Sequence, residues 1–223
     1  MKRIIQIKVC GLTEAKIAAA CAALEIDAVG LVFYPQSPRC VSDVQAEEIA
    51  AAVNGRAAVI GVFVDEPADE ILRKVKRCGL TGVQLHGRET PAEVTQLKNE
   101  GLTVIKALFQ KRDPTFQSLF RYSPSAFLLE CGRGQLPGGT ARVWDWTGAK
   151  AIVANAPLIL AGGLTPENVS QAVRRGRPDA VDVSSGVEAS PGKKDLTKIK
   201  AFVSAVAGIV PTDDDAKARR IFK

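Results

Sequence analysis

The sequence predicts an α/β fold, a single (β/α)8 barrel (TIM barrel) with a parallel inner sheet. Short apolar runs alternate with segments of helical periodicity along the 223 residues, and this alternation is typical of strand–helix units around a parallel sheet. The runs start roughly 20 to 35 residues apart, which fits one strand, one helix and two loops. Capping residues independently indicate where several helices begin.

Eight apolar runs are expected to form the strands of the barrel. In chain order they are Ile4–Val9, Ala28–Phe33, Ala57–Val62, Gly82–Leu85, Thr103–Leu108, Ala126–Leu129, Leu158–Leu160 and Ala180–Val183. An open doubly wound sheet would use the same elements, but that fold would need a dinucleotide-binding turn or a P-loop to explain its function. The sequence contains neither motif.

Helix starts are indicated by residues that cap free backbone N–H groups. The segment Thr90–Glu93 combines a capping Thr, a Pro at the first helical position and a Glu that reaches back, which predicts a capping box. Ser42 with Gln45 repeats the box, and Thr165–Pro166 repeats its Thr-Pro half. In the first helix, the residues expected to face the sheet recur at steps of three and four: Ile17, Ala20, Cys21 and Leu24.

Composition indicates a globular protein with a packed core, since hydrophobic residues make up 46% and charged residues 24% of the chain. The segment Met1–Cys10 lacks the continuous apolar stretch of a signal peptide, and no run reaches the roughly 18 apolar residues of a membrane helix. We therefore expect a cytoplasmic protein without membrane contact. One barrel domain is expected over residues 1–210, followed by a loosely ordered extension over residues 211–223.

Charge and cysteine content argue against several classes of function. The net charge is +6, but basic residues are scattered and interleaved with acidic ones, so a solvated basic surface that also attracts small anions is expected rather than a nucleic-acid site. The five cysteines are widely spaced without a C-x-x-C pair, and the chain has one histidine. We expect neither a disulfide framework nor a metal site.

In a parallel barrel the active site lies at the carboxyl ends of the strands, so the residues after each run are the functional candidates. Cys10 directly follows the first run, close to the start of the next helix, where a thiolate would be stabilised. Cys10 is therefore a candidate base or nucleophile, although a cysteine after a strand is more often an inert core residue.

Glycine- and serine-rich loops follow the seventh and eighth runs. The first loop contains Gly162 and Gly163, and the second contains Ser184, Ser185 and Gly186. Glycines let backbone N–H groups approach a phosphate closely, and serine hydroxyls add donors. Because barrels commonly bind phosphate at these two loops, the sequence predicts a phosphate site there rather than two plain glycine turns.

Six ordered motifs along nearly the whole chain are similar to those of one enzyme family, the phosphoribosylanthranilate isomerases of tryptophan biosynthesis. The motifs are Lys8–Thr13, Phe33–Arg39, Gln84–Gly87, Pro137–Thr140 with Asp145–Trp146, Ala161–Leu164, and Asp182–Glu188. Each motif alone is weak, whereas the six in order are specific.

The resemblance implies an Amadori rearrangement of N-(5-phosphoribosyl)anthranilate to 1-(2-carboxyphenylamino)-1-deoxyribulose 5-phosphate, an aldose–ketose isomerisation without metal or organic cofactor. It places the family's catalytic base at Cys10 and its general acid at Glu130, at the end of the sixth run. It further implies that Arg39 holds the anthranilate carboxylate and that Asp182 positions the sugar hydroxyls or the bridging nitrogen. The glycine and serine loops would hold the phosphate.

Two positions depart from the family pattern. Glu130 stands where the family has an aspartate, and Ala141 stands where a glycine commonly follows Gly-Gly-Thr. Glutamate is still a carboxylic acid, but its extra methylene moves the carboxyl by roughly 1 Å, which can cost about a hundredfold in rate. His86, after the fourth run, suits a structural or shaping role and is not included in the catalytic pair.

Three other functions share the barrel and the phosphate loops. A ribulose-phosphate 3-epimerase would need several metal-binding histidines, which a single histidine excludes. A histidine-pathway or dual-specificity Amadori isomerase would use paired aspartates, which Cys10 disfavours. A catalytically silent phosphosugar-binding barrel stays open because of Glu130 and Ala141. The expected partner is a small phosphosugar substrate carrying anthranilate, and a monomer is the default, with a homodimer as the alternative.

Overall fold

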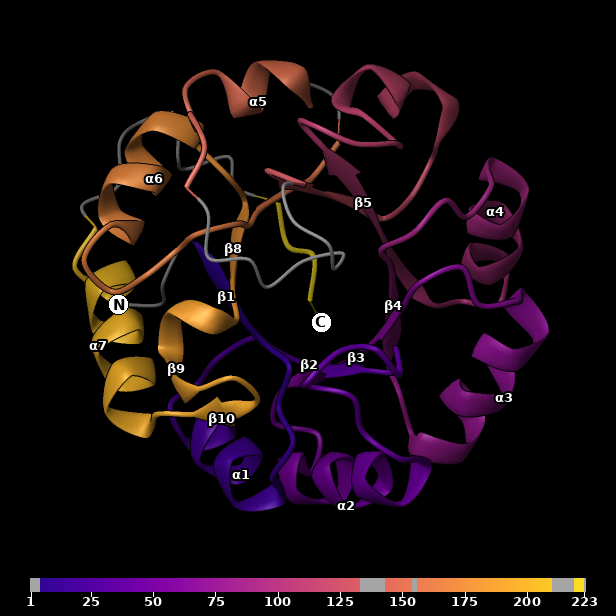
Figure 1. Cartoon of the computed structure of the whole chain (residues 1–223), viewed down its shortest axis with the longest axis horizontal. Coiled ribbons are helices and arrows are strands. Elements are labelled where there is room, and N and C mark those ends of the chain that lie inside the picture. The colour runs from indigo at the N-terminus through magenta and orange to yellow at the C-terminus, as the bar shows by residue number, and fades with distance from the viewer. Residues whose placement is uncertain (1–4, 133–142, 154–155, 210–218, 223) are drawn as a thin grey trace.

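The computed structural model describes residues 5–132, 143–153, 156–209 and 219–222. Within these residues, eight parallel strands follow one another round a closed barrel, β1 to β8, with β8 paired to β1. Helices surround the barrel (Figure 1). The predicted (β/α)8 barrel is therefore confirmed, and the open doubly wound sheet is excluded.

The strands lie close to the expected runs. Their bounds are β1 Gln6–Cys10, β2 Ala28–Val32, β3 Ala58–Phe63, β4 Gly82–Leu85, β5 Thr103–Phe109, β6 Ala126–Glu130, β7 Leu158–Leu160 and β8 Ala180–Val183. β1 and β6 each extend one residue beyond the expected run. Cys10 and Glu130 are therefore the last residues of strands rather than the first residues of loops.

The surrounding helices follow the strands in order. They are α1 Ala15–Ala23, α2 Asp43–Val53, α3 Ala68–Cys78, α4 Pro91–Asn99, α5 Ala149–Ile152, α6 Val169–Gly176 and α7 Leu196–Ala207. Between β5 and β6 the connection contains a 3-10 helix, η1 Phe116–Arg121, and after β8 a second one, η2 Ser185–Val187. A short hairpin of β9 Glu188–Ser190 and β10 Lys193–Lys194 then precedes α7 and was not expected from the sequence.

Both expected capping boxes are present. The side chain of Ser42 accepts a hydrogen bond from Gln45 N, and that of Thr90 accepts one from Glu93 N. The predicted face of α1 is shifted by about one position, but Cys21 lies in the core as expected.

The helix start predicted at Thr165–Pro166 is wrong, because α6 begins only at Val169. The backbone N–H of Thr165 donates to Asn168 Oδ1 at 2.8 Å, which folds this segment into a turn before the helix.

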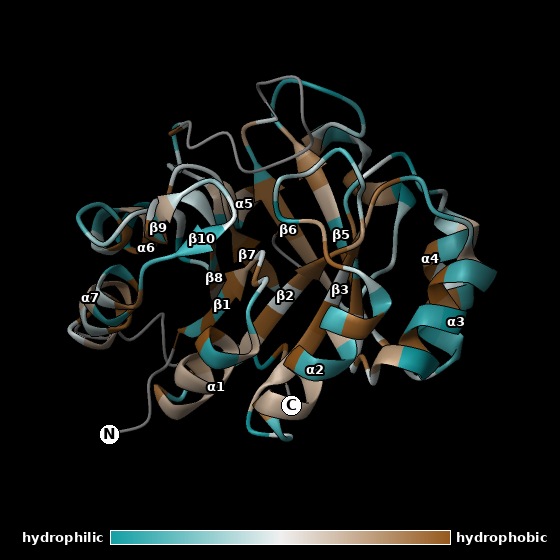
Figure 2. Ribbon diagram, turned by 60° about the horizontal axis from the view of Figure 1, so that its bottom comes forward, coloured by the Kyte–Doolittle hydropathy of each residue, from teal (hydrophilic) through white to brown (hydrophobic). Residues whose placement is uncertain are grey.

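Apolar side chains form two layers, one on each side of the strands. Alternate residues of a strand point to opposite faces, and the buried residues separate accordingly. The inner cluster includes Ile60, Ile105, Ala107, Leu128 and Ile159. The outer cluster includes Ile7, Leu31, Val83, Leu108 and Val181, and it contains buried residues of the helices as well. In Figure 2 the strands are largely hydrophobic, and hydrophilic residues lie along α2, α3 and α4.

The far end of the chain closes the amino end of the barrel. Ile221 and Phe222 are buried in the inner apolar cluster. The side chain of Gln6, at the start of β1, accepts a hydrogen bond from Ile221 N at 2.6 Å and donates one to Phe222 O at 3.0 Å. Figure 1 shows this end of the chain near the centre of the ring. Residues 219–222 are therefore packed against the barrel, although a loosely ordered extension was expected over 211–223.

Candidate active site

The two catalytic candidates lie at the carboxyl end of the barrel, as expected. Cys10 is the last residue of β1 and is 7% exposed, and Glu130 is the last residue of β6 and is 4% exposed. β7 and β8 lie between β6 and β1 round the closed sheet. The loops predicted to bind phosphate follow these two intervening strands.

Cys10 lies among charged groups inside the barrel. A Cβ atom on Gly30 of β2 would lie 2.7 Å from Cys10 Sγ and 3.1 Å from Lys8 Nζ, so both groups occupy the space that this glycine leaves free. Burial raises the pKa of the Cys10 thiol above its ordinary value. The ammonium groups of Lys8 and Lys194 oppose that rise, whereas the Asp182 carboxylate adds to it.

Asp182 is paired with Lys8, which was not among the predicted site residues. Lys8 Nζ donates to Asp182 Oδ1 at 2.9 Å, and both side chains are buried. The two residues are register partners on β1 and β8. Although burial disfavours the charged form of Lys8, the pKa of its ammonium is raised, because Asp182 and Cys10 stabilise the charge.

Glu130 contacts the single histidine of the chain. His86 Nε2 lies 3.2 Å from Glu130 Oε2, within ion-pair distance but without the alignment of a hydrogen bond. The other ring nitrogen of His86 is 2.9 Å from Gln84 Nε2, and the ring packs edge-on against Phe109. A Cβ atom on Gly162 would come within 3.0 Å of Glu130 Cγ. This glycine therefore makes room for the longer side chain, and His86 shapes the space beside the carboxyl group.

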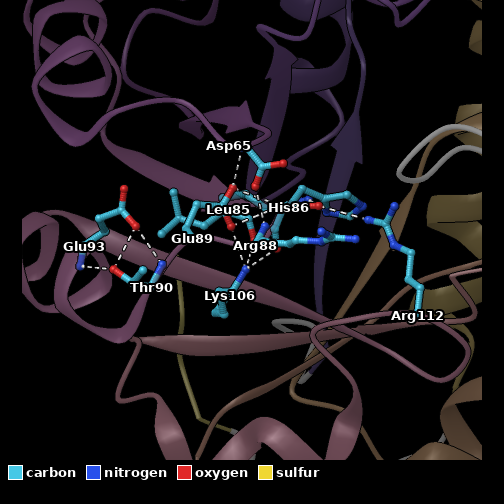
Figure 3. Close-up of polar contacts among 11 residues, drawn as sticks. Asp65, Leu85, His86, Arg88, Glu89, Thr90, Glu93, Lys106 and Arg112 are labelled. Carbon is cyan, nitrogen blue, oxygen red and sulfur yellow. Dashed lines mark hydrogen bonds and ion pairs between the residues drawn. The ribbon is translucent and has the colours of Figure 1, made fainter.

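The loop that carries His86 is anchored by a buried ion pair (Figure 3). Lys106 Nζ on β5 donates to Glu89 Oε2 at 2.6 Å and to Gly87 O at 2.8 Å. Burial lowers the pKa of the Lys106 ammonium, and Glu89 opposes this effect. Arg112 Nη2 donates to His86 O at 3.0 Å from the opposite side. Lys106 and Arg112 therefore hold the backbone at Gly87 and His86, which fixes the position of the His86 ring. Removing one partner of the ion pair would leave a buried charge.

Arg39, the expected ligand of the anthranilate carboxylate, is buried and already holds a carboxylate of the protein. Its Nε and Nη2 atoms donate to Glu188 at 2.8 and 2.7 Å. Lys194 Nζ donates to the same carboxylate at 2.6 Å. Burial opposes ionisation of Glu188, but the hydrogen bonds from Arg39 and Lys194 hold the pKa of its carboxyl below the usual value. Glu188 and Lys194 were not among the predicted site residues.

The loop after β7 has the backbone that its glycines permit. Gly162 and Gly163 have φ angles of 86° and 69°, a left-handed conformation that favours glycine. Asn168 Nδ2 donates to Gly163 O at 2.8 Å, which holds the loop against the residues before α6.

The loop after β8 packs against both its neighbours. Ser184 Oγ donates to Cys10 O at 3.0 Å, which joins this loop to the end of β1. Ser185 and Gly186 begin η2. A Cβ atom on Gly186 would collide with the carbonyl oxygen of Leu164, so the two glycine-containing loops touch through their backbones. The assignment of phosphate to these loops stays a prediction.

One family motif falls partly outside the described residues. Pro137–Thr140 and Ala141 lie there, whereas Asp145–Trp146 is described. Trp144, just before this pair, donates from its indole N–H to Ala161 O at 2.9 Å. This bond ties the start of the described segment to the residue after β7.

The sequence matches a known enzyme family along nearly its whole length. Residues 7–205 match the family described as N-(5'phosphoribosyl)anthranilate (PRA) isomerase. The chain is 49% identical over 218 residues to the N-(5'-phosphoribosyl)anthranilate isomerase of Desulfatibacillum aliphaticivorans, and the match covers 98% of this chain and 99% of that protein.

Solved structures of the same kind of enzyme share the fold. The phosphoribosyl anthranilate isomerase of Thermotoga maritima is 36% identical, with a TM-score of 0.84 that covers 92% of this chain and 99% of that one. A phosphoribosyl anthranilate isomerase in complex with reduced 1-(o-carboxyphenylamino)-1-deoxyribulose 5-phosphate gives 36% identity and a TM-score of 0.81, again over 92% and 99%. Sequence and fold agree, and the chain belongs to the N-(5'-phosphoribosyl)anthranilate isomerase family.

Proposed function

We propose that this chain converts N-(5'-phosphoribosyl)anthranilate to 1-(2-carboxyphenylamino)-1-deoxyribulose 5-phosphate in tryptophan biosynthesis, with Cys10 as base and Glu130 as acid. Family membership makes the chain an isomerase of the aldose–ketose type. The observation that carries the assignment is the placement of the two groups, each buried at the carboxyl end of its strand, with the loops of β7 and β8 between them. A substrate whose phosphate is held by those loops lies between acid and base.

The reaction needs one proton donor and one proton acceptor. Glu130 protonates the furanose oxygen, and the bond from that oxygen to C1 breaks to give an open-chain iminium ion. The Cys10 thiolate removes the C2 proton, and the electron pair left on C2 neutralises the iminium as an enolamine. The enol hydroxyl then loses a proton and C1 gains one, which gives the ketone without a net change in protons.

Binding of the substrate uses the remaining polar groups. Glu188 occupies the Nε and Nη2 atoms of Arg39, and we assign the anthranilate carboxylate to the Nη1 side of the guanidinium. Lys8 engages Oδ1 of Asp182, and we assign a sugar hydroxyl or the bridging nitrogen to Oδ2. Backbone N–H groups of Gly162, Gly163, Ser184, Ser185 and Gly186 are the proposed phosphate ligands.

One assay tests this function. Freshly prepared phosphoribosylanthranilate should be consumed by the purified protein, with a matching loss of anthranilate fluorescence. A silent binding barrel would bind the reduced product analogue without turnover. A dual-specificity isomerase would also convert the histidine-pathway aminoaldose, and that substrate would compete with phosphoribosylanthranilate.

We also propose that the protein is a cytoplasmic monomer. All five cysteines are free thiols, in keeping with a reducing compartment. Among the described residues, none of the helices has the length and apolar character needed to span a bilayer. Light scattering on the purified protein distinguishes the monomer from a homodimer.

A further inference from the structure

The reaction proposed above leaves a fully buried cation inside the barrel without a role. Lys8 is 0% exposed and lies on the inner face of β1, two residues before Cys10. Residues two apart on a strand point to the same face, so Lys8 lies directly below Cys10 in the barrel interior. A lysine is rarely buried unless it is paired and its charge has a use.

The position of the Lys8 ammonium is fixed from two sides. Asp182 on β8 accepts its hydrogen bond at 2.9 Å. On β2, the missing side chain of Gly30 leaves the space in which Lys8 Nζ and Cys10 Sγ lie side by side. The ammonium therefore has one carboxylate partner and one thiol partner.

We propose that Lys8 is a positioning residue for the base, and that its ammonium, held by Asp182, stabilises the thiolate form of Cys10. The inference rests on the proposed function only in taking Cys10 as the proton acceptor. It explains how a buried thiol can lose its proton, because a neighbouring cation offsets the cost of burying an anion.

The charges around Cys10 support this assignment. Lys8 on β1 and Lys194 on β10 act directly on the thiol, as does Asp182 on β8. Beyond them lie Glu188 on β9 and Arg39 after β2, which bind each other and Lys194. The three cations and two carboxylates leave one positive charge in excess. Ionisation of Cys10 to the thiolate would bring this buried cluster to neutrality.

The pKa directions agree with the geometry. The pKa of Lys8 is raised even though burial opposes its charge, and Asp182 and Cys10 both contribute to the rise. Burial lowers the pKa of Lys194, against the attraction of Glu188 and Cys10. Of the two lysines that act on Cys10, Lys8 therefore keeps its positive charge more firmly than Lys194.

The test measures the thiol in the free protein, apart from turnover. The rate of Cys10 alkylation by iodoacetamide is followed against pH by peptide mass spectrometry, which separates Cys10 from the other cysteines. In Lys8→Met the midpoint of this profile should move up by about one pH unit or more, so that alkylation at a fixed lower pH slows at least about tenfold. The rising limb of kcat/KM should shift by the same amount.

A matched control is Lys106→Met. Lys106 is also 0% exposed and paired with a carboxylate, but it interacts with Glu89 and the backbone after β4 rather than with Cys10. This variant should leave the midpoint of Cys10 alkylation unchanged. A shift as large as that of Lys8→Met would mean that loss of any buried ion pair disturbs the thiol, and would overturn the proposal.

A second variant keeps the test valid if Lys8→Met does not fold. Lys8→Met with Asp182→Asn leaves no unpaired buried charge. Because Asp182 itself raises the pKa of the Cys10 thiol, the midpoint of the double variant should fall between those of the parent and Lys8→Met. A parental midpoint in a folded single or double variant would overturn the inference.

If neither variant folds, the test is made on the parent protein by NMR. The NMR signals of the Lys8 side chain should then show a titration step at the Cys10 midpoint, and Cys10→Ala should abolish that step. Its absence would contradict the proposal. If the parent turns over substrate but the midpoint of Cys10 alkylation is the same in Lys8→Met, only this inference is wrong. If the midpoint shifts but the parent does not turn over substrate, the proposed function is wrong.

Discussion

The carboxylate of Glu188 holds the guanidinium of Arg39 through two hydrogen bonds, of 2.8 Å to Nε and 2.7 Å to Nη2. A bidentate pair of this kind fixes the plane of the guanidinium as well as its position. Glu188→Gln should therefore loosen Arg39 and raise KM by about tenfold or more, with a smaller effect on kcat. Arg39→Lys, which cannot form the fork, should raise KM at least as much.

The control for this pair is Glu47→Gln, which breaks the exposed contact of 2.8 Å between Glu47 and Arg77 on the outer helices. Exposed ion pairs contribute little, so steady-state kinetics of that variant should match those of the parent. A parental KM in Glu188→Gln would show that the substrate does not depend on how Arg39 is held.

Removal of the Cys10 thiol should abolish turnover without unfolding the protein. The parent kcat/KM should rise with pH, because only the thiolate accepts a proton and burial raises the pKa of this thiol. Cys21→Ala is the matched control, since Cys21 is a buried thiol of α1 in the outer core cluster. It should keep the parent kcat, and circular dichroism should show both variants folded. Measurable turnover by Cys10→Ala would exclude the thiol as base.

Glu130→Gln should reduce turnover by at least about a hundredfold, the scale of a positioned proton donor, while substrate binding is nearly unchanged. Glu130→Asp should retain measurable activity, because the acid is kept and only its reach is shortened. Single-turnover kinetics separates the two effects. If Glu130→Gln turns over at the parent rate, the carboxylate is a bystander and another group opens the ring.

Gly186→Val should weaken substrate binding severely, because its side chain would collide with the backbone at Leu164 and displace both phosphate loops. We expect KM to rise by about tenfold or more. Gly55→Val is the control, since a Cβ atom there meets nothing within 4 Å and its φ of 69° confines the strain to its own backbone. An unchanged KM in Gly186→Val would place the phosphate elsewhere.

Activity should survive dialysis against EDTA. In the part of the chain that the structure describes, no three His, Cys, Asp or Glu side chains are grouped to hold a metal ion. Proton transfer between Cys10, Glu130 and the substrate needs no Lewis acid. Loss of turnover that zinc or magnesium restores would contradict this prediction.

The barrel could be predicted from the sequence because each strand is a short apolar run followed by polar residues. β4, β7 and β8 match their expected bounds. The β9–β10 hairpin was not predicted because Glu188–Ser190 and Lys193–Lys194 lack the alternation of apolar and polar residues that indicates a strand. The helix start predicted at Thr165–Pro166 was wrong because a Thr-Pro pair also suits a turn. Here the side chain of Asn168 accepts the hydrogen bond that closes that turn.

Within the site, residue type revealed chemistry but not pairing. Cys10 and Arg39 could be found from motifs, whereas the partners of Arg39 could not, because ion pairs between distant segments leave no mark in a single sequence. Lys8 did leave a signal, since a lysine inside an apolar strand run must be either exposed or paired. Lys194 gave no comparable signal, because it stands in a polar segment, and Glu188 was indicated only as the last residue of the motif Asp182–Glu188.

Because Phe222 packs in the inner cluster and accepts a hydrogen bond from Gln6, the amino end of the barrel is closed by residues 216 positions apart in the sequence. Folding must bring these two distant segments together before the inner cluster is shielded from water at this end of the barrel. This contact lies at the end of the barrel opposite Cys10, so a substitution that breaks it should hinder assembly of the barrel before it hinders catalysis.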